Sequence, residues 1–235
     1  MKHFNKNPKV IIILGPPGSG KGTQSGLLAE KFGLYYFETA KVGEERINQA
    51  KKGEYILADG QKYYFENEKK LWKSGKLWSP PFITALVKDK IKELAAKKQN
   101  IVFAGSPRTI YEGEKLTPLL KKLYGKENIT VILIEQSAEA SIFRNSHRRI
   151  CELVRHPILY SKENEKLKKC PLDGSKLIRR KGLDDPETIK TRLKEYKERT
   201  LPLIDYFKEE KLLVKKINGS PPPAIVFKNI LKTLE

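Results

Sequence analysis

The sequence is poor in the features of secreted and membrane proteins. Its two cysteines, in 235 residues, are too few for a disulfide framework and are typical of a reducing compartment. The longest apolar run, Val10–Leu14, is far shorter than the ~20 residues that span a bilayer. No apolar segment with a small-residue cleavage site follows the charged N-terminus, so we expect no signal peptide. These absences predict a cytoplasmic protein with no membrane partner.

Acidic residues are also scarce, with 28 against 47 lysines and arginines, which gives a formal net charge of +19. Such a balance favours anionic partners. The excess is mostly lysine, spread along the chain with glutamates between, and the sequence has no arginine-rich tail, zinc-finger spacing or basic–aromatic stripe. We therefore expect no nucleic acid partner. The charge indicates either a general enrichment in lysine or attraction for nucleotide phosphates.

Apolar strands alternate with helical segments through most of the chain. Val10–Leu14 is continuous and β-branched, which is typical of a strand buried on both faces of a parallel sheet, and Ile101–Ala104 and Thr130–Ile134 are similar. This order predicts an α/β fold with a doubly wound parallel sheet. Two stretches interrupt the alternation. Residues 40–80 are charged, aromatic and helical, and residues 150–185 have the length of a lid or a binding loop.

Residues 15–23 read Gly-Pro-Pro-Gly-Ser-Gly-Lys-Gly-Thr, and Gly15, Gly20 and Lys21 have the spacing of a P-loop. Glycines let backbone N–H groups turn toward a phosphate, and the helix that follows points its positive end at the same anion. Lys21 adds a mobile charge that follows a transferring phosphoryl group. Gly22 stands where serine or threonine usually follows the lysine, and Thr23 comes one residue later. The loop predicts a P-loop NTPase core that binds a phosphate group.

The P-loop and four further pieces, in the same order over nearly the whole chain, resemble the adenylate kinase family. The further pieces are Ser74-Gly75-Lys76-Leu77, Gly105-Ser106-Pro107-Arg108-Thr109, Phe143-Arg144 with Arg148-Arg149, and Asp184-Asp185 with Arg192-Leu193. The resemblance implies transfer of the γ-phosphate of ATP to a nucleoside monophosphate, with AMP first (ATP + AMP = 2 ADP). It also implies Mg²⁺ with ATP and a monomer.

The same resemblance implies a core with two insertions. The expected division is core with P-loop 1–39, helical monophosphate-binding lobe 40–80, core 81–149, lid 150–185 and core 186–235. ATP phosphates are expected in the P-loop, and the acceptor under the lobe. Lid closure excludes water, so that phosphate passes to the nucleotide.

Roles are carried over from the family residue by residue. The expected catalytic residues are Lys21, Arg108, Arg148 and Arg192. The expected ATP-binding residues are Gly15, Gly18, Ser19, Gly20, Lys21, Gly22, Thr23, Arg144 and Gly219. The expected acceptor-binding residues are Thr39, Arg46, Gly105, Arg108 and Glu112, and the expected lid arginine is Arg180, or Arg179.

Departures from the family pattern gather on the acceptor side. The family's Ser-Thr-Gly-Asp is Glu38-Thr39-Ala40-Lys41 here, and the arginine that follows falls on Glu44, or on Arg46 if two residues are inserted. Ala104 replaces an aspartate that helps to organise magnesium-bound water. Glu112 replaces a glutamine expected to read the acceptor base. These departures leave two alternatives open: a kinase for another monophosphate, or a catalytically weakened nucleotide-binding protein of the same fold.

The expected lid raises the question of a metal. Cys151 and Cys170 lie where many relatives carry four zinc ligands, but Val154 cannot bind a metal. His156 is close enough to replace it, which gives Cys151, His156, Cys170 and Asp173, an acceptable set for Zn²⁺. A site that has lost its metal and is held by packing is the alternative.

Overall fold

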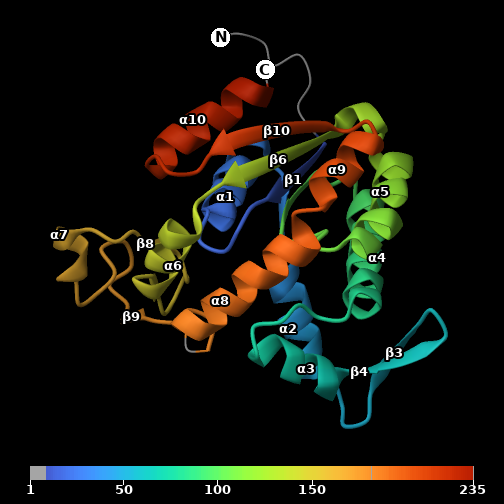
Figure 1. Cartoon of the computed structure of the whole chain (residues 1–235), viewed down its shortest axis with the longest axis horizontal. Helices are drawn as coiled ribbons and strands as arrows, with labels where there is room; N and C mark the ends of the chain where they lie inside the picture. Colours follow the sequence, from blue (N-terminus) through green and yellow to red (C-terminus); the bar gives the residue numbers. More distant parts are fainter. Residues whose placement is uncertain (1–8, 181, 235) are drawn as a thin grey trace.

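The computed structural model (Figure 1) describes residues 9–180 and 182–234. At its centre lies a five-stranded parallel sheet in the order β10-β6-β1-β5-β2. Its strands are β1 (Val10–Leu14), β2 (Tyr35–Glu38), β5 (Ile101–Ala104), β6 (Ile129–Glu135) and β10 (Leu213–Asn218). The predicted α/β fold with a parallel sheet is confirmed.

Helices cover both faces of this sheet (Figure 1). One face carries α1 (Lys21–Phe32) and α10 (Pro223–Leu234), and the other carries α4 (Pro80–Ala96), α5 (Ile110–Tyr124) and α9 (Leu203–Glu209). Strand residues alternate between the two layers: Ile11 and Ile13 pack toward α1, whereas Val10, Ile12 and Leu14 pack toward α4. Burial on both sides explains why these strands are apolar without alternation.

Residues 40–80 contain a hairpin between two helices. The elements are α2 (Thr39–Gln49), β3 (Tyr55–Ala58), β4 (Gln61–Tyr64) and α3 (Phe65–Lys73). The antiparallel pair β3–β4 was not expected from the helical pattern. Its sequence signal is Asp59-Gly60, two residues with positive φ that suit a tight hairpin turn.

Residues 150–185 form a small sheet with a short helix. Helix α6 (Ala138–Ser146) leads into it, and its elements are β7 (Arg149–Cys151), β8 (Pro157–Ile158), α7 (Lys162–Glu165) and β9 (Leu177–Ile178). The strand order is β8-β7-β9, antiparallel throughout. The boundaries of the lobe and the lid stay predictions.

The chain returns to the core through a helical stretch that crosses between these two segments (Figure 1). It consists of α8 (Pro186–Glu195), the π-helical turn η2 (Tyr196–Thr200) and α9, while a 3-10 turn, η1 (Lys126–Asn128), precedes β6. None of the described helices combines the length and the apolar character needed to cross a bilayer.

Candidate active site

The loop between β1 and α1 has no room for a side chain at two of its glycines, Gly15 and Gly18. A Cβ on Gly15 would lie 2.5 Å from the Ile134 carbonyl oxygen, and a Cβ on Gly18 would lie 2.5 Å from Asn145 Nδ2. Helix α6 supports the loop from outside, since Ser141 Oγ donates to the Pro17 carbonyl at 2.6 Å. The Ser19 amide donates to the Pro16 carbonyl at 3.2 Å, and the loop is held in a turn of the kind whose other N–H groups bind an anion.

Lys21 begins α1 and folds back over the loop. Its Nζ donates to the carbonyl oxygens of Gly15 at 2.6 Å and Pro16 at 2.8 Å. Burial lowers the pKa of Lys21 well below its usual range, and the charges of Arg108 and Arg192 lower it further. An ammonium group in this position gains stability when an anion arrives.

Three arginines from separate elements converge on Lys21. Arg108 follows β5, Arg148 follows α6 and Arg192 lies on α8. Burial, with repulsion from Arg180, lowers the pKa of Arg148 to about 10, and burial with repulsion from Arg180, Arg108 and Arg148 lowers that of Arg192 to about 9. Cations held together against desolvation and mutual repulsion form a site for a multiply charged anion.

Asp184 is the acidic partner of these arginines. Its buried carboxylate accepts from Arg180 Nε at 2.9 Å and from Arg180 Nη2 at 2.6 Å. Arg148 Nη1 lies 3.8 Å from it and Arg192 Nη1 lies 4.0 Å from it. Sequence reasoning used the pair Asp184-Asp185 only to recognise the helix after the lid, and it missed this role. Asp184 balances only part of the charge of Lys21 and these arginines, so the cluster stays positive.

Arg144 and Gly219 meet beside the P-loop. Arg144 donates from Nη1 to the Gly219 carbonyl and from Nη2 to the Ser220 carbonyl, both at 2.9 Å. Gly219 sits so close to β6 that a Cβ would lie 2.6 Å from Ile134 Cγ2 and 2.8 Å from the Glu135 carbonyl oxygen. The structure therefore brings together these two residues, which were selected for the donor adenine.

Glu112 is buried at the start of α5 and is held by its own neighbours. Its carboxylate accepts from Ser106 Oγ at 3.2 Å, from the Arg108 amide at 3.1 Å and from Thr109 Oγ1 at 3.2 Å, and its own amide donates to Thr109 Oγ1. Thr109 is thus the N-cap of α5, and Glu112 ties the residues before the helix to its first turn. Burial raises the pKa of Glu112 although these donors act against it. At most about one of the four acceptor positions of the carboxylate remains for a ligand.

The structure places only some of the other predicted acceptor residues near the cationic cluster. Gly105 lies under Arg108, since a Cβ on it would be 2.7 Å from Nη2, and Thr39 is buried with no hydrogen-bond partner for Oγ1. Arg46 instead pairs with Glu54 at 2.6 Å and covers the Phe65 ring at 4.9 Å. Glu44 is the residue of this helix whose charge interacts with Arg155, Glu38 and Arg180, and burial raises its pKa. The structure thus does not bring Arg46 to the cationic cluster.

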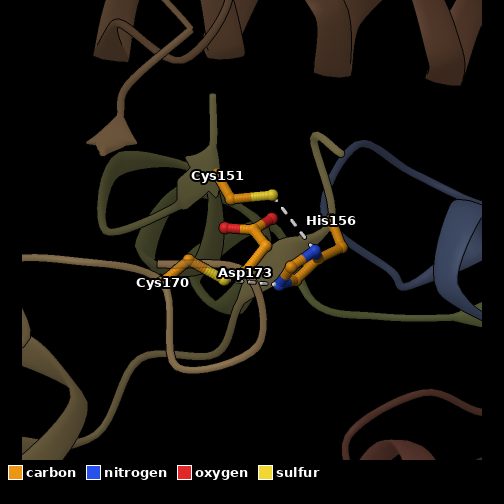
Figure 2. A group of neighbouring side chains, drawn as sticks. All are labelled: Cys151, His156, Cys170 and Asp173. Atoms are coloured by element: carbon orange, nitrogen blue, oxygen red, sulfur yellow. Dashed lines mark hydrogen bonds between the residues drawn. The ribbon is translucent and has the colours of Figure 1, made fainter. Parts of the chain in front are cut away.

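The four residues selected as metal ligands do meet (Figure 2). Their ligand atoms all lie within 4.8 Å of one another, and the His156 ring stands between the two thiols, with Nδ1 3.1 Å from Cys151 Sγ and Nε2 3.1 Å from Cys170 Sγ. Asp173 Oδ2 is buried and has no hydrogen-bond partner. Val154 is 65% exposed, which agrees with its exclusion as a ligand.

Comparison with known proteins agrees with this geometry. The family model described as adenylate kinase matches residues 13–212. The adenylate kinase of Methanothrix thermoacetophila is 32% identical over 225 residues, which cover 95% of this chain and 97% of the relative. The adenylate kinase of Kosmotoga olearia is 32% identical over 228 residues, which cover 96% of this chain and 98% of the relative. That of Chlamydia trachomatis serovar D is 29% identical over 243 residues, covering 98% and 92%.

Proposed function

The chain belongs to the adenylate kinase family, and from this premise we propose that it transfers the γ-phosphoryl group of ATP to AMP, giving two ADP. The observation that carries the proposal is the convergence of Lys21, Arg108, Arg148 and Arg192 at the mouth of the P-loop. Phosphoryl transfer depends on positioning and on charge neutralisation more than on covalent chemistry. This cluster supplies both.

On the donor side, the cradle from Gly15 to Thr23 holds the ATP phosphates through backbone N–H groups. Lys21 exchanges the Gly15 and Pro16 carbonyls for phosphate oxygens and follows the transferring group. Arg148 and Arg192 bridge the two substrates. Arg144 and the Gly219 turn border the adenine, and Arg180, tied to Asp184, brings the lid over the phosphates.

On the acceptor side, Arg108 holds the monophosphate, with Gly105 and Thr39 at the mouth of the pocket. Glu112 contributes to the choice of base. Because an ionised carboxylate only accepts hydrogen bonds, it favours a base with amino and ring N–H donors over unprotonated adenine. That observation supports a second candidate, a kinase for another monophosphate with the same donor chemistry.

Magnesium accompanies ATP in such a reaction and neutralises charge on the β- and γ-phosphates. Mg²⁺ takes oxygen ligands and usually retains several waters. The Thr23 hydroxyl in the first turn of α1 is an oxygen ligand of the right class, whereas the Ala104 methyl group at the end of β5 is not. The donor set at the P-loop therefore fits Mg²⁺ held largely by phosphates and water.

We also propose that Cys151, His156, Cys170 and Asp173 hold Zn²⁺ in the lid. Two thiolates, one imidazole and one carboxylate make a closed tetrahedral set for a structural zinc. The carboxylate oxygen of Asp173 that lacks a partner supports the assignment. Zinc bound there would join β7 to the loop before β9. The chain is proposed to act as a monomer in the cytoplasm, a reducing compartment in which free thiols are usual.

The proposal is tested by acceptor profiling. The full chain is incubated with Mg·ATP and each of AMP, GMP, CMP and UMP, and both nucleoside diphosphates are measured. We expect equal amounts of ADP from donor and acceptor with AMP. A higher rate with another monophosphate would establish the second candidate. Release of inorganic phosphate without a new diphosphate would contradict both.

A further inference from the structure

Strand β5, one of the two neighbours of β1, carries no carboxylate at the end beside the P-loop. Strand β5 is hydrogen-bonded to β1 and ends at Ala104, whose methyl group offers no ligand. Protein sites for Mg²⁺ and nucleotide generally use one or two carboxylates with the substrate phosphates. A carboxylate must therefore come from another place if the metal of Mg·ATP is to be positioned by the protein.

The next strand, β2, ends in a carboxylate at the same level of the sheet as Ala104. Strand β2 pairs with β5 in parallel, and its last residue, Glu38, is in register with Ala104. The Phe37 and Phe103 rings pack at 4.8 Å in the layer under α4 and α5. Because strand side chains alternate, Glu38 and Ala104 both face the opposite layer, where α1 lies.

The position of Tyr36 shows that this face of β2 lies close to the P-loop. It stands two residues before Glu38 on the same side of β2 and packs in the layer that contains Leu28 of α1. A Cβ on Gly22 would lie 3.1 Å from Tyr36 Oη. The second residue of α1 therefore sits above Tyr36, and Glu38 lies one step nearer the edge at which the phosphates bind.

The Glu38 carboxylate is exposed and available. In the part of the chain that the structure describes, it makes no ion pair and no side-chain hydrogen bond. Its negative charge acts on two groups of the site. Burial raises the pKa of Tyr36, and Glu38 raises it further. Burial lowers the pKa of Arg108, and Glu38 partly reverses this shift.

Two other carboxylates near this edge are turned away or engaged, and a third, Glu44 on α2, is half-buried and interacts with Arg155 and Arg180. Glu135 ends β6, the other neighbour of β1, but it shares a face with Leu133, which packs in the layer away from α1. It also lies 3.5 Å from Lys216. Asp184 is occupied by Arg180 and lies near two further arginines.

We propose that Glu38 is a positioning residue for the metal of Mg·ATP and that it holds metal-bound water from the strand beyond Ala104. Strand β2 lies two strand spacings, or ~10 Å, from β1, a distance that a glutamate side chain and one metal-bound water together span. The proposal rests on the proposed function only in taking Mg·ATP as the ligand of the P-loop.

The test measures ATP binding to the full chain by titration calorimetry, with and without Mg²⁺. The quantity compared is the ratio of the two dissociation constants. In Glu38→Gln we expect this ratio to shrink by about tenfold, the lower end of the effect of losing an outer partner of a metal site. Metal-free ATP should bind equally well or more tightly, because a negative charge has been removed. Glu135→Gln is the matched control and should keep the wild-type ratio.

A second variant separates position from charge. Adding Ala104→Asp to Glu38→Gln puts a carboxylate on the adjacent strand and should restore the effect of Mg²⁺. A wild-type ratio in Glu38→Gln would overturn the proposal, as would equal weakening of ATP binding with and without metal. Because no acceptor is used, a chain that binds Mg·ATP in this Glu38-dependent way but makes no diphosphate would contradict the proposed function alone.

Discussion

The donor side and the acceptor side of the site are built in different ways. Around the P-loop, backbone groups and cations from β1, α1, α6 and α8 come together. The loop tolerates little change in sequence, since a Cβ at Gly15 or Gly18 would clash with neighbouring atoms. On the acceptor side, Glu112 serves the start of α5 and Arg46 serves Glu54. We infer that binding of phosphate depends on the backbone of the fold, whereas binding of the acceptor depends on single side chains that can take other roles.

The donor side should fail most severely when its charge is removed. We expect Lys21→Ala to lower the transfer rate by about 10³-fold or more, the scale of a cation supplied to a transferring phosphoryl group. The exposed Lys122→Ala is the control and should keep the wild-type rate. Circular dichroism of both variants checks the fold. Near-normal turnover in a folded Lys21→Ala would refute the assignment of this lysine.

Arg148 should show the next largest effect, because we propose that it bridges the two substrates. Arg148→Ala should lower kcat by about 10²-fold with a smaller change in KM, since its charge acts mainly in the transition state. Arg199→Ala removes an arginine that pairs with Glu195 outside the cluster, and it should leave kcat unchanged. Equal kcat values for the two variants would show that the arginine map carried over from the family is wrong.

The lid metal should affect stability more than chemistry. Protein purified without chelators should contain one equivalent of zinc, and its removal should lower Tm by about 5 °C, which corresponds to about 2 kcal/mol in a chain of this size. His156→Ala should lose the metal, and Val154→Ala, an exposed neighbour, should retain it. Stoichiometric zinc in His156→Ala would exclude this histidine as a ligand.

A change at Glu112 on the acceptor side should have the smallest effect on activity, and this effect should depend on pH. Burial raises the pKa of Glu112, so its carboxyl keeps a proton to higher pH than an exposed glutamate. The protonated form can donate to adenine, and ionisation removes that donor. We therefore expect kcat/KM for AMP, relative to GMP, to fall as pH rises through the raised pKa.

Glu112→Gln keeps an amide donor at every pH, so its AMP preference should be severalfold higher and flat with pH. The capping bonds from Ser106 and the Arg108 amide can still reach the amide oxygen. An unchanged ranking and pH profile in this variant would leave Glu112 as a helix cap alone.

The sequence predicted the features that depend on local order. The P-loop spacing, the strands and the four converging cations follow from short patterns, and the metal set followed once Val154 was rejected. Ion pairs between side chains that are distant in the sequence could not be predicted in this way. Asp184 meets its arginines only because α6 and α8 approach each other, and the Arg46–Glu54 pair needs the unexpected hairpin that begins after Glu54. The cap of α5 is a local pattern that could have been recognised from Thr109 with Glu112 three residues later.

The most direct test of the central claim, that this cationic site passes phosphate between nucleotides, follows the γ-phosphate itself. ATP labelled at the γ-phosphate is mixed with AMP, Mg²⁺ and the full chain, and the products are separated after a short time. The account predicts that the label appears in ADP, with one labelled ADP for each AMP consumed, and that Arg148→Ala slows its appearance by about 10²-fold. Label that accumulates in inorganic phosphate, or that remains in ATP while AMP is bound, would contradict it.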